Sequence, residues 1–314
     1  LRGHIQKLKY IIIDEYQDTS QLFFELVQTI RKYNPDIKII CVGDNWQLIN
    51  SFAGSEMRFF KNFSEYYPWA KQLSLRTTYR CTPTIVEAAN VLMERPWELI
   101  SWVEWKSWFV RLITLEDFYK ENPEDQKYWN ALIKTVLEKI IKPKYQTKDK
   151  NESPQFRILS RINHDLDNFN SSGKDIDIKK IMYSLKERTE NFYNYSKKVD
   201  QWLALETAHS AKGLEADYVL LLNVGDSFPM IHPDNIYGII FWETLSDILE
   251  EERRLFYVAI TRAKYGLYYT LWKKTHSSEE VNPVLAFIDA FASKLPGAQE
   301  GIKKQMISIE DIPF

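Results

Sequence analysis

Cysteine and long apolar runs are both scarce in this chain of 314 residues. The two cysteines, Cys41 and Cys81, are too few for a disulfide framework and are typical of a reducing compartment. Apolar runs such as residues 218–224 fall far short of the roughly 18 residues that span a bilayer. The N-terminus has no signal-peptide pattern. We therefore expect a cytoplasmic protein that does not enter a membrane.

An excess of charge of one sign is also missing. The 41 Lys and Arg residues stand against 43 Asp and Glu residues, for a formal net charge of -2. This balance excludes a polycation held to nucleic acid by bulk charge, so any contact with phosphate backbones must use a local surface. At roughly 150 residues per domain, the length predicts about two domains, and it suffices to bury a core without disulfides.

The hydrophobic pattern predicts an α/β fold with parallel sheets and flanking helices. Residues 9–13 and 37–42 are short β-branched runs without alternation, which is typical of strands buried on both faces. Between them, apolar residues recur at helical spacing after Thr19–Ser20 and stop at Asn34–Pro35. Strand, helix and strand with short connections predict a parallel pair. Further strands are expected at 73–75, 109–115, 155–160, 203–207, 217–223 and 267–271, and helices at 82–92, 124–141, 244–262 and 281–292.

Polar residues follow each of the first two expected strands. Asp14 and Glu15 end the first strand, and residues 42–47 form a polar cluster at the end of the second. Ligands bind at the carboxyl ends of parallel strands, so an acidic pair there is placed to hold a metal and polarise a water. The alternative is that these carboxylates only leave the core for solvent and cap the next helix. The second polar cluster favours a shared functional rim.

Five sequence blocks resemble, in the family's order, the UvrD/Rep family of superfamily 1 helicases. Asp14–Thr19 resembles the Walker B motif of that family, and Gly43–Ile49 resembles the motif that follows it. A further stretch, Phe156–Arg161, is similar to a strand of the family's second motor domain. The remaining three of the five blocks are Leu75–Arg80 with Ile85 and Ala89–Asn90, then Thr207–Glu215, then Glu251–Lys264.

The resemblance implies two RecA-like P-loop NTPase domains that bind ATP and Mg²⁺ in the cleft between them. We expect residues 1–72 to be the C-terminal part of a truncated first motor domain and residues 73–314 to be the second. A reduced, divergent insertion is expected around 94–155, and the pattern does not place 171–200. Because the chain starts at Leu1 rather than Met, we expect it to be a piece of something longer.

The resemblance also implies the roles of the residues that handle ATP. Asp14 would hold Mg²⁺, Glu15 would activate the attacking water, and Gln47 would sense the γ-phosphate. Arg80 and Arg262 would be arginine fingers. These roles suit phosphoryl transfer, which asks the protein mainly for positioning and charge neutralisation.

Arg262 has support of its own from helical spacing. Glu251, Leu255, Val258 and Arg262 follow i, i+4, i+7 and i+11, so they lie near one face of the expected helix. A buried Arg at the end of such a stripe needs an anionic partner. The alternative to a finger is a structural salt bridge to a nearby glutamate.

The block Thr207–Glu215 carries two further implied nucleotide contacts. Glu215 would accept a hydrogen bond from the ribose, and Gly213 would let the backbone turn close to the ligand. The alternative for Lys212 and Gly213 is an ordinary helix C-cap.

Implied nucleic-acid contacts are Phe52, Thr207, His209 and Lys212. Phe52 matches an aromatic platform of the family, and stacking of a base on such a ring is worth about 1–3 kcal/mol in any sequence. The alternative for Phe52 is core packing. The partners implied are single-stranded DNA and its junctions with duplex.

The sequence departs from the family at several positions. Asn50 replaces a usual aromatic residue, Ala53 a usual Arg, and Ala216 a usual Phe, which makes the DNA contacts less secure than those to ATP. Four of the ten tryptophans lie within residues 97–108 and form either a protein-partner or stacking face or a local core cluster; they are Trp97, Trp102, Trp105 and Trp108.

The function expected from the resemblance is that of the C-terminal portion of an ATP-dependent DNA helicase or translocase acting on single strands. Two alternatives stay open. One is a helicase-like subunit of a nuclease or RNA polymerase-associated complex, and the other is a non-catalytic interaction scaffold.

No Gly-x-x-x-x-Gly-Lys-Ser/Thr motif occurs in these 314 residues, so the phosphate-cradling loop of a P-loop ATPase is missing from them. We therefore predict that this chain alone binds ATP weakly and hydrolyses it negligibly in a steady-state phosphate-release assay. Measurable turnover that Glu15→Gln removes would contradict this prediction.

Overall fold

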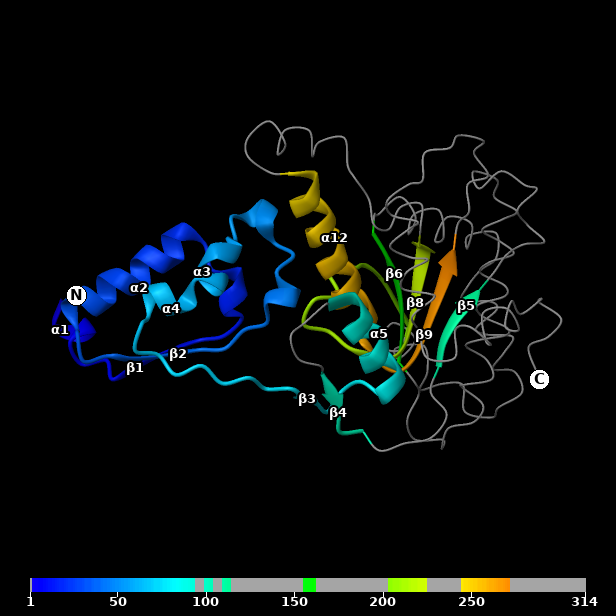
Figure 1. Cartoon of the computed structure of the whole chain (residues 1–314), viewed down its shortest axis with the longest axis horizontal. Helices are drawn as coiled ribbons and strands as arrows, with labels where there is room; N and C mark the ends of the chain where they lie inside the picture. Colours follow the sequence, from blue (N-terminus) through cyan, green and yellow to red (C-terminus); the bar gives the residue numbers. More distant parts are fainter. Residues whose placement is uncertain are drawn as a thin grey trace, which may run out of the picture. The chain divides into compact units, whose positions relative to one another are not determined.

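The computed structural model describes residues 2–93, 99–103, 109–113, 155–161, 203–224 and 244–271 (Figure 1). The chain divides into two compact units, Leu1–Leu75 and Arg76–Phe314. Their assignment to two motor domains stays a prediction. The helices expected at 124–141 and 281–292, and the segment 171–200, lie outside the described residues.

The first unit is built on a parallel pair of strands joined by a helix, which confirms the expected order of these elements. Ile13 at the end of β1 lies opposite Cys41 at the end of β2. Short helices complete the unit. Its elements are α1 (Arg2–Ile5), β1 (Tyr10–Ile13), η1 (Tyr16–Asp18), α2 (Gln21–Tyr33), β2 (Lys38–Cys41), η2 (Asn45–Gln47), η3 (Ser51–Ala53), α3 (Met57–Lys61) and α4 (Phe63–Tyr66).

Helix α2 begins and ends at the residues that the pattern indicated. Ser20 is its N-cap, and the Ser20 side chain accepts a hydrogen bond from the backbone of Phe23 at 3.3 Å. Asn34 is its C-cap, and the Asn34 amide donates to the carbonyls of Ile5 and Leu8 at 2.9 and 2.7 Å. These bonds hold the helix end against the segment that leads into β1.

The expectation that β1 and β2 are buried on both faces is wrong. Ile12 is 71% exposed and Ile40 is 47% exposed, whereas Ile13 is buried. Successive side chains of a strand point to opposite faces, and in the described residues the core of this unit packs on one face only. That core comprises Ile13, Tyr16, Val27 and Tyr67, with Ile11, Ile39 and Cys41 packed against it.

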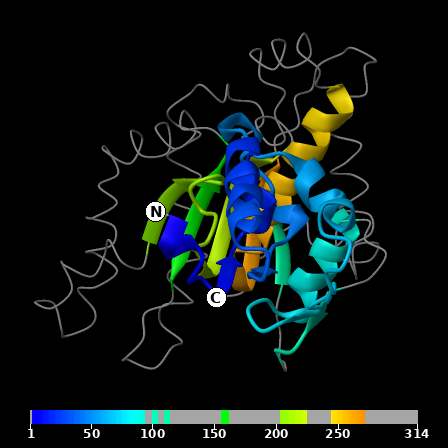
Figure 2. The ribbon, with the colours of Figure 1, turned by 90° about the vertical axis from the view of Figure 1, so that its left-hand side faces the viewer.

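The second unit contains a five-stranded sheet in which every strand is parallel, as the α/β pattern predicted. The strand order is β5-β9-β8-β6-β7, and Figure 2 shows the strands side by side. The central strand β8 is the longest buried run, consistent with a strand covered on both faces. The strands are β5 (Phe109–Ile113), β6 (Phe156–Ser160), β7 (Leu203–Thr207), β8 (Ala216–Val224) and β9 (Ala263–Leu271).

Helices α5 (Pro83–Met93) and α12 (Leu245–Ile260) lie on the same side of this sheet and contact one another (Figure 1). Pro83 occupies the first position of α5, where its missing N–H costs nothing. Thr244 and Asp247 form a reciprocal capping box at the start of α12. Residues within the first turn therefore determine where each of these two helices begins.

Two expected elements differ from those in the structure. Residues 73–75 form no strand, and Leu73 and Leu75 are 89% and 82% exposed. The nearby strand is instead β3 (Thr77–Thr78), which pairs in parallel with β4 (Ile100–Ser101). Helix α12 ends at Ile260, before Arg262, because β9 begins at Ala263. The Thr261 hydroxyl donates to the Tyr257 carbonyl at 2.8 Å and so satisfies a helix-end acceptor.

In the part of the chain that the structure describes, no helix combines the length and apolar character needed to cross a membrane.

Packing of α12 on the sheet predicts a stability difference along one helix. We expect Leu255→Ala to lower the free energy of unfolding by about 2–5 kcal/mol, because Leu255 is 1% exposed and its truncation leaves a cavity. Ser246→Ala, at an exposed position of the same helix, should change it by no more than about 0.5 kcal/mol. Urea unfolding followed by circular dichroism measures both; equal effects would contradict the packing of α12.

Candidate functional site

In the first unit, the segments that follow β1 and β2 run side by side. The Val42 N–H donates to the Ile13 carbonyl at 2.9 Å, and the Tyr16 N–H donates to the Val42 carbonyl at 2.8 Å. Backbone pairing thus continues beyond both strands. The shared polar rim that the sequence favoured is present, formed by residues 14–17 and 42–44.

Glu15 has an unusual backbone conformation at this rim. Its φ of 50° and ψ of 45° lie in the left-handed region, and no other described non-glycine residue has a positive φ. This conformation costs an L-residue roughly 1–2 kcal/mol, and such strain is concentrated at functional sites. The Glu15 N–H donates to Asp14 Oδ1 at 2.9 Å, so the Asp14 carboxylate is held against the backbone of Glu15.

Gln17 holds this rim together, although the sequence analysis assigned it no role. The Gln17 side chain is fully buried. Its Nε2 donates to Glu15 Oε2, and its Oε1 accepts from the Asp44 N–H at 2.9 Å. The sequence indicates this role only through the place of the glutamine inside the block Asp14–Thr19. If an amide there is buried, it must find hydrogen-bond partners at both ends.

Gln47 is held at the same rim by Asp44. Asp44 caps η2, its Oδ1 accepting from the Trp46 N–H at 3.1 Å and its Oδ2 from Gln47 Nε2 at 3.2 Å. The structure thus brings Gln47 into one hydrogen-bonded chain with Gln17 and Glu15. Phe52 lies in η3, and its side chain lies outside the described part of the structure.

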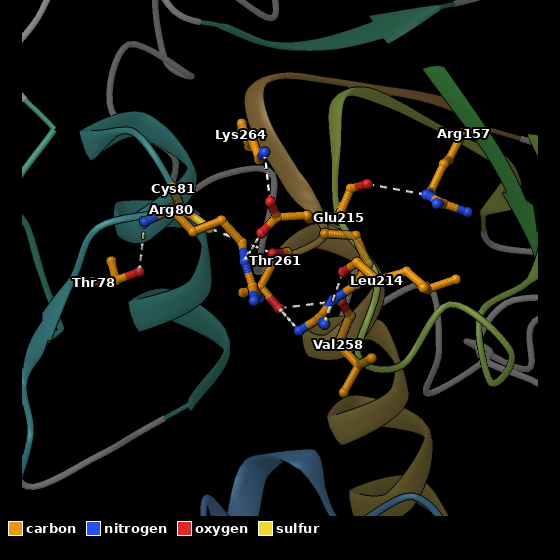
Figure 3. Close-up of polar contacts among 10 residues, drawn as sticks. Thr78, Arg80, Cys81, Arg157, Leu214, Glu215, Val258, Thr261 and Lys264 are labelled. Carbon is orange, nitrogen blue, oxygen red and sulfur yellow. Dashed lines mark hydrogen bonds and ion pairs between the residues drawn. The ribbon is translucent and has the colours of Figure 1, made fainter. Parts of the chain in front are cut away.

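In the second unit, Glu215 lies between two cations that come from different elements (Figure 3). Lys264 Nζ is 2.5 Å from Glu215 Oε1, and Arg80 Nε is 2.8 Å from Oε2. The hydrogen bond from Lys264 is the largest cause that lowers the pKa of the Glu215 carboxyl; burial opposes it, and the Arg80 hydrogen bond and the two positive charges lower the pKa further. Two residues implied by the resemblance are therefore in contact, and Lys264, which was not singled out, completes the cluster.

Arg262 is buried, with 1% of its surface exposed. Its Nε donates to the Val258 carbonyl at 2.8 Å and its Nη1 to the Leu214 carbonyl at 3.2 Å. Its Nη2 donates to Thr261 Oγ1 at 3.2 Å. Arg262 thus links the end of α12 to the backbone beside Glu215, a placement that helical spacing did not foresee.

Other ion pairs of the second unit brace the strands around this cluster. Arg157 on β6 donates to the Glu215 carbonyl at 3.1 Å (Figure 3). It also pairs with Glu206 on β7 at 2.6 Å. Arg161 makes a two-pronged contact to Glu252 of α12, with its shortest distance 2.7 Å. Such bidentate pairs are geometrically specific, so they set how β6 sits against its neighbours.

Thr207, one of the implied nucleic-acid contacts, lies at the opposite end of the strands from Glu215. Thr207 ends β7 at its carboxyl end, whereas Glu215 and Lys264 lie at the amino ends of β8 and β9. The Thr207 hydroxyl lies 3.0 Å from that of Ser210 and begins the turn that follows. Thr207 and Glu215 therefore lie at opposite ends of their strands, and residues 208–214 connect them.

His209 and Gly213 lie in this turn. Burial, and then the nearby Arg161 charge, lower the pKa of His209 from 6.5 to about 4, so the imidazole is neutral at pH 7. Gly213 has φ of 79°, and the Leu214 N–H donates to the Ala211 carbonyl at 3.0 Å. Residues 208–213 are turns that follow β7 directly, so the alternative expected for Gly213, a helix C-cap, is wrong.

The residues at the rim suit a magnesium ion that is bound mainly by phosphates and water. No group of three or more His, Cys, Asp or Glu side chains that could hold a metal occurs among the described residues. Mg²⁺ in phosphate-transfer sites takes one or two carboxylates and fills the rest of its shell with phosphates and water. Asp14 fits that requirement.

Neither cysteine is suited to nucleophilic chemistry. Burial raises the pKa of both the Cys41 and Cys81 thiols to about 11, so each stays protonated at neutral pH. Of the tryptophans at 97–108, the structure describes Trp102, which is 67% exposed with its ring 6.0 Å from that of Tyr79. A core position is thereby excluded for Trp102.

Comparisons with known proteins agree with the sequence blocks. A family model described as UvrD-like helicase C-terminal domain matches residues 113–274, and one described as UvrD/REP helicase N-terminal domain matches residues 2–68. DNA helicase IV of Escherichia coli (strain K12) is 27% identical over 301 residues, which is 93% of this chain and 38% of that protein. A probable DNA helicase of Mycoplasma pneumoniae is 27% identical over 274 residues, 85% of this chain and 44% of that one.

The chain therefore spans less than half the length of these two relatives. A solved structure, that of PRRSV helicase, is similar over 82% of this chain and 34% of that one, with 16% identity and a TM-score of 0.38. That similarity is too low to bear on the fold.

Parallel α/β sheets, together with these matches, indicate a P-loop helicase fold. The C-terminal match covers more than half of the chain, and this chain belongs to the UvrD-like helicase family.

The pKa of His209 predicts a pH-dependent stability. As pH falls from 6.5 to about 4, the unfolded chain binds a proton at His209 that the folded chain does not, so the free energy of unfolding should decrease over that range. His209→Gln should remove this component of the slope in urea titrations. An imidazole that titrates near 6.5 by NMR would contradict the burial of His209.

Proposed function

We propose that this chain is the C-terminal portion of an ATP-dependent DNA helicase or translocase that acts on single-stranded DNA. The observation that carries the proposal is the hydrogen-bonded rim at the ends of β1 and β2, where Glu15, Gln17, Asp44 and Gln47 form one connected chain. ATP hydrolysis needs a water, a metal and a phosphate held in fixed relation. In this proposal, Asp14 holds Mg²⁺, Glu15 orients the attacking water, and Gln47 senses the γ-phosphate.

Groups of the second unit supply positive charge and a sugar contact. Arg80 has a side chain 36% exposed, so it can exchange Glu215 for a phosphate without leaving a buried site. Glu215 then accepts a hydrogen bond from the ribose while Lys264 continues to hold its other oxygen. ATP binding at the cleft between two RecA-like domains is part of the proposal and follows from the resemblance.

Arg262 has a more constrained role in this proposal. As an arginine finger it would have to exchange one of its present acceptors, the Leu214 carbonyl among them, for a phosphate oxygen. While it bonds the Leu214 carbonyl, it fixes the backbone that carries Glu215. We propose that Arg262 both stabilises this backbone and contributes charge, and that Gly213 allows the adjoining turn.

The proposed DNA track uses Phe52, Thr207, His209 and Lys212. A neutral His209 binds a phosphate as a hydrogen-bond donor and adds no charge, consistent with a chain that is nearly neutral overall. Contacts of this kind, with stacking on Phe52, are tolerant of sequence. Single strands and their junctions with duplex are the expected substrates.

Turnover of the complete protein that carries this chain tests the roles of the two arginines. We expect Arg80→Ala to lower DNA-stimulated kcat by about 10³–10⁵-fold, the range for an arginine finger, with little change in melting temperature because Arg80 is half-buried. Arg262→Ala should also abolish turnover, but with a clear loss of stability, since it removes a buried donor from three acceptors.

Arg58→Ala is the matched control, because Arg58 is exposed and pairs with Glu56 outside the rim. Wild-type turnover in Arg80→Ala would refute the finger assignment. A complete protein that binds DNA and partners but never hydrolyses ATP would favour the scaffold alternative.

A further inference from the structure

We propose that Gln17 is a positioning residue that holds the Glu15 carboxylate in a fixed relation to the backbone of Gly43 and Asp44. The inference rests on the proposed function, in which Glu15 orients the attacking water and Gln47 senses the γ-phosphate. Its own basis is geometric and lies within the first unit.

Both ends of the Gln17 amide are committed. A carboxylate only accepts and a backbone N–H only donates, so Nε2 must face Glu15 and Oε1 must face Asp44, as the structure has them. With 0% of its surface exposed, Gln17 has no water to turn to. Loss of either partner would leave a buried polar group unsatisfied, which costs about 1–3 kcal/mol.

Gly43 shows how closely this amide is fitted to the second strand end. A Cβ at position 43 would lie 2.6 Å from Gln17 Oε1, 3.0 Å from the Tyr16 nitrogen and 3.1 Å from the Gln17 nitrogen. Real Cβ contacts are essentially never shorter than 3.0 Å, so any side chain there would push the amide away. Gly43 is therefore required for space, and the space it leaves is filled by the Gln17 side chain.

The left-handed backbone conformation of Glu15 also makes its carboxylate depend on the hydrogen bond from Gln17. Its conformation is unfavourable by itself, and a hydrogen bond from the side chain two residues later holds the carboxylate in place. A carboxylate restrained through one oxygen presents the other in a defined direction. Misplacement of a catalytic group by about 1 Å can cost on the order of 10²-fold in rate.

The test compares variants of the complete protein that carries this chain. Gln17→Met keeps the size and removes both hydrogen bonds, whereas Gln17→Glu keeps an acceptor for Asp44 and sets a second carboxyl group against Glu15 in place of the amide donor. We expect each to lower DNA-stimulated kcat by about 10²-fold with KM for ATP within about threefold of wild type. Gln21→Met, on the exposed start of α2, is the matched control and should be neutral.

A double variant separates positioning from plain structural support. If Gln17 acts through Glu15, then Glu15→Gln with Gln17→Met should turn over no more slowly than Glu15→Gln alone in long single-turnover incubations. A further loss in the double variant would overturn the inference, as would wild-type kcat in both Gln17 variants. Failure of both Gln17 variants to fold would also overturn it, because it would assign Gln17 to stability alone.

Different results would refute the proposed function of the rim and the proposed role of Gln17. Unchanged turnover in Glu15→Gln would refute the proposed function of the rim. Loss of turnover in Glu15→Gln with full turnover in Gln17→Met would refute only the role of Gln17.

Discussion

The requirement that buried polar groups be hydrogen-bonded at both ends determines how this chain organises its strand ends. At the ends of β1 and β2, the amide of Gln17 has one partner on each segment, so the two segments have a single relative position. Gly43 leaves the space that the amide occupies. Because Asp44 then holds Gln47, one buried side chain sets the geometry of the whole rim.

The second unit follows the same rule with charged groups. The buried guanidinium of Arg262 is satisfied by carbonyls from α12 and from the segment before β8, which binds the helix end to that strand. Glu215 lies between Lys264 and Arg80, so one carboxylate holds together two cations that would otherwise repel one another. Charge and burial together thus gather residues of three sequence blocks at one edge of the sheet.

One short segment of chain joins the two ends of the strands in the second unit. The Glu215 cluster lies at the amino ends of β8 and β9, whereas Thr207 lies at the carboxyl end of β7. The turn at 208–213 connects these regions, and Gly213 allows it through its positive φ. A change at the Glu215 cluster therefore has a short covalent route to the turn that carries His209, which gives the proposed nucleotide and DNA contacts a physical connection.

Local pattern predicted much of this molecule, namely the parallel α/β sheets, the start of α2 at Ser20, the start of α12 at Thr244, and the strand at Leu203–Thr207. These features depend on neighbours within a few residues, and periodicity and capping report them directly. The expected burial of both faces of β1 was wrong, because exposure depends on what packs above a strand. The expected strand at 73–75 was wrong because a short apolar run has no ladder without a partner strand.

The sequence by itself determined the family, through blocks whose residues and order are specific, and it predicted which residues handle ATP. Only the tertiary structure decided which of them meet. Arg80 and Glu215 are 135 residues apart, and no periodicity records such a pairing. Gln17 and the burial of Arg262 likewise emerged only once strand ends and helix ends were brought together, because a hydrogen bond between distant segments depends on packing.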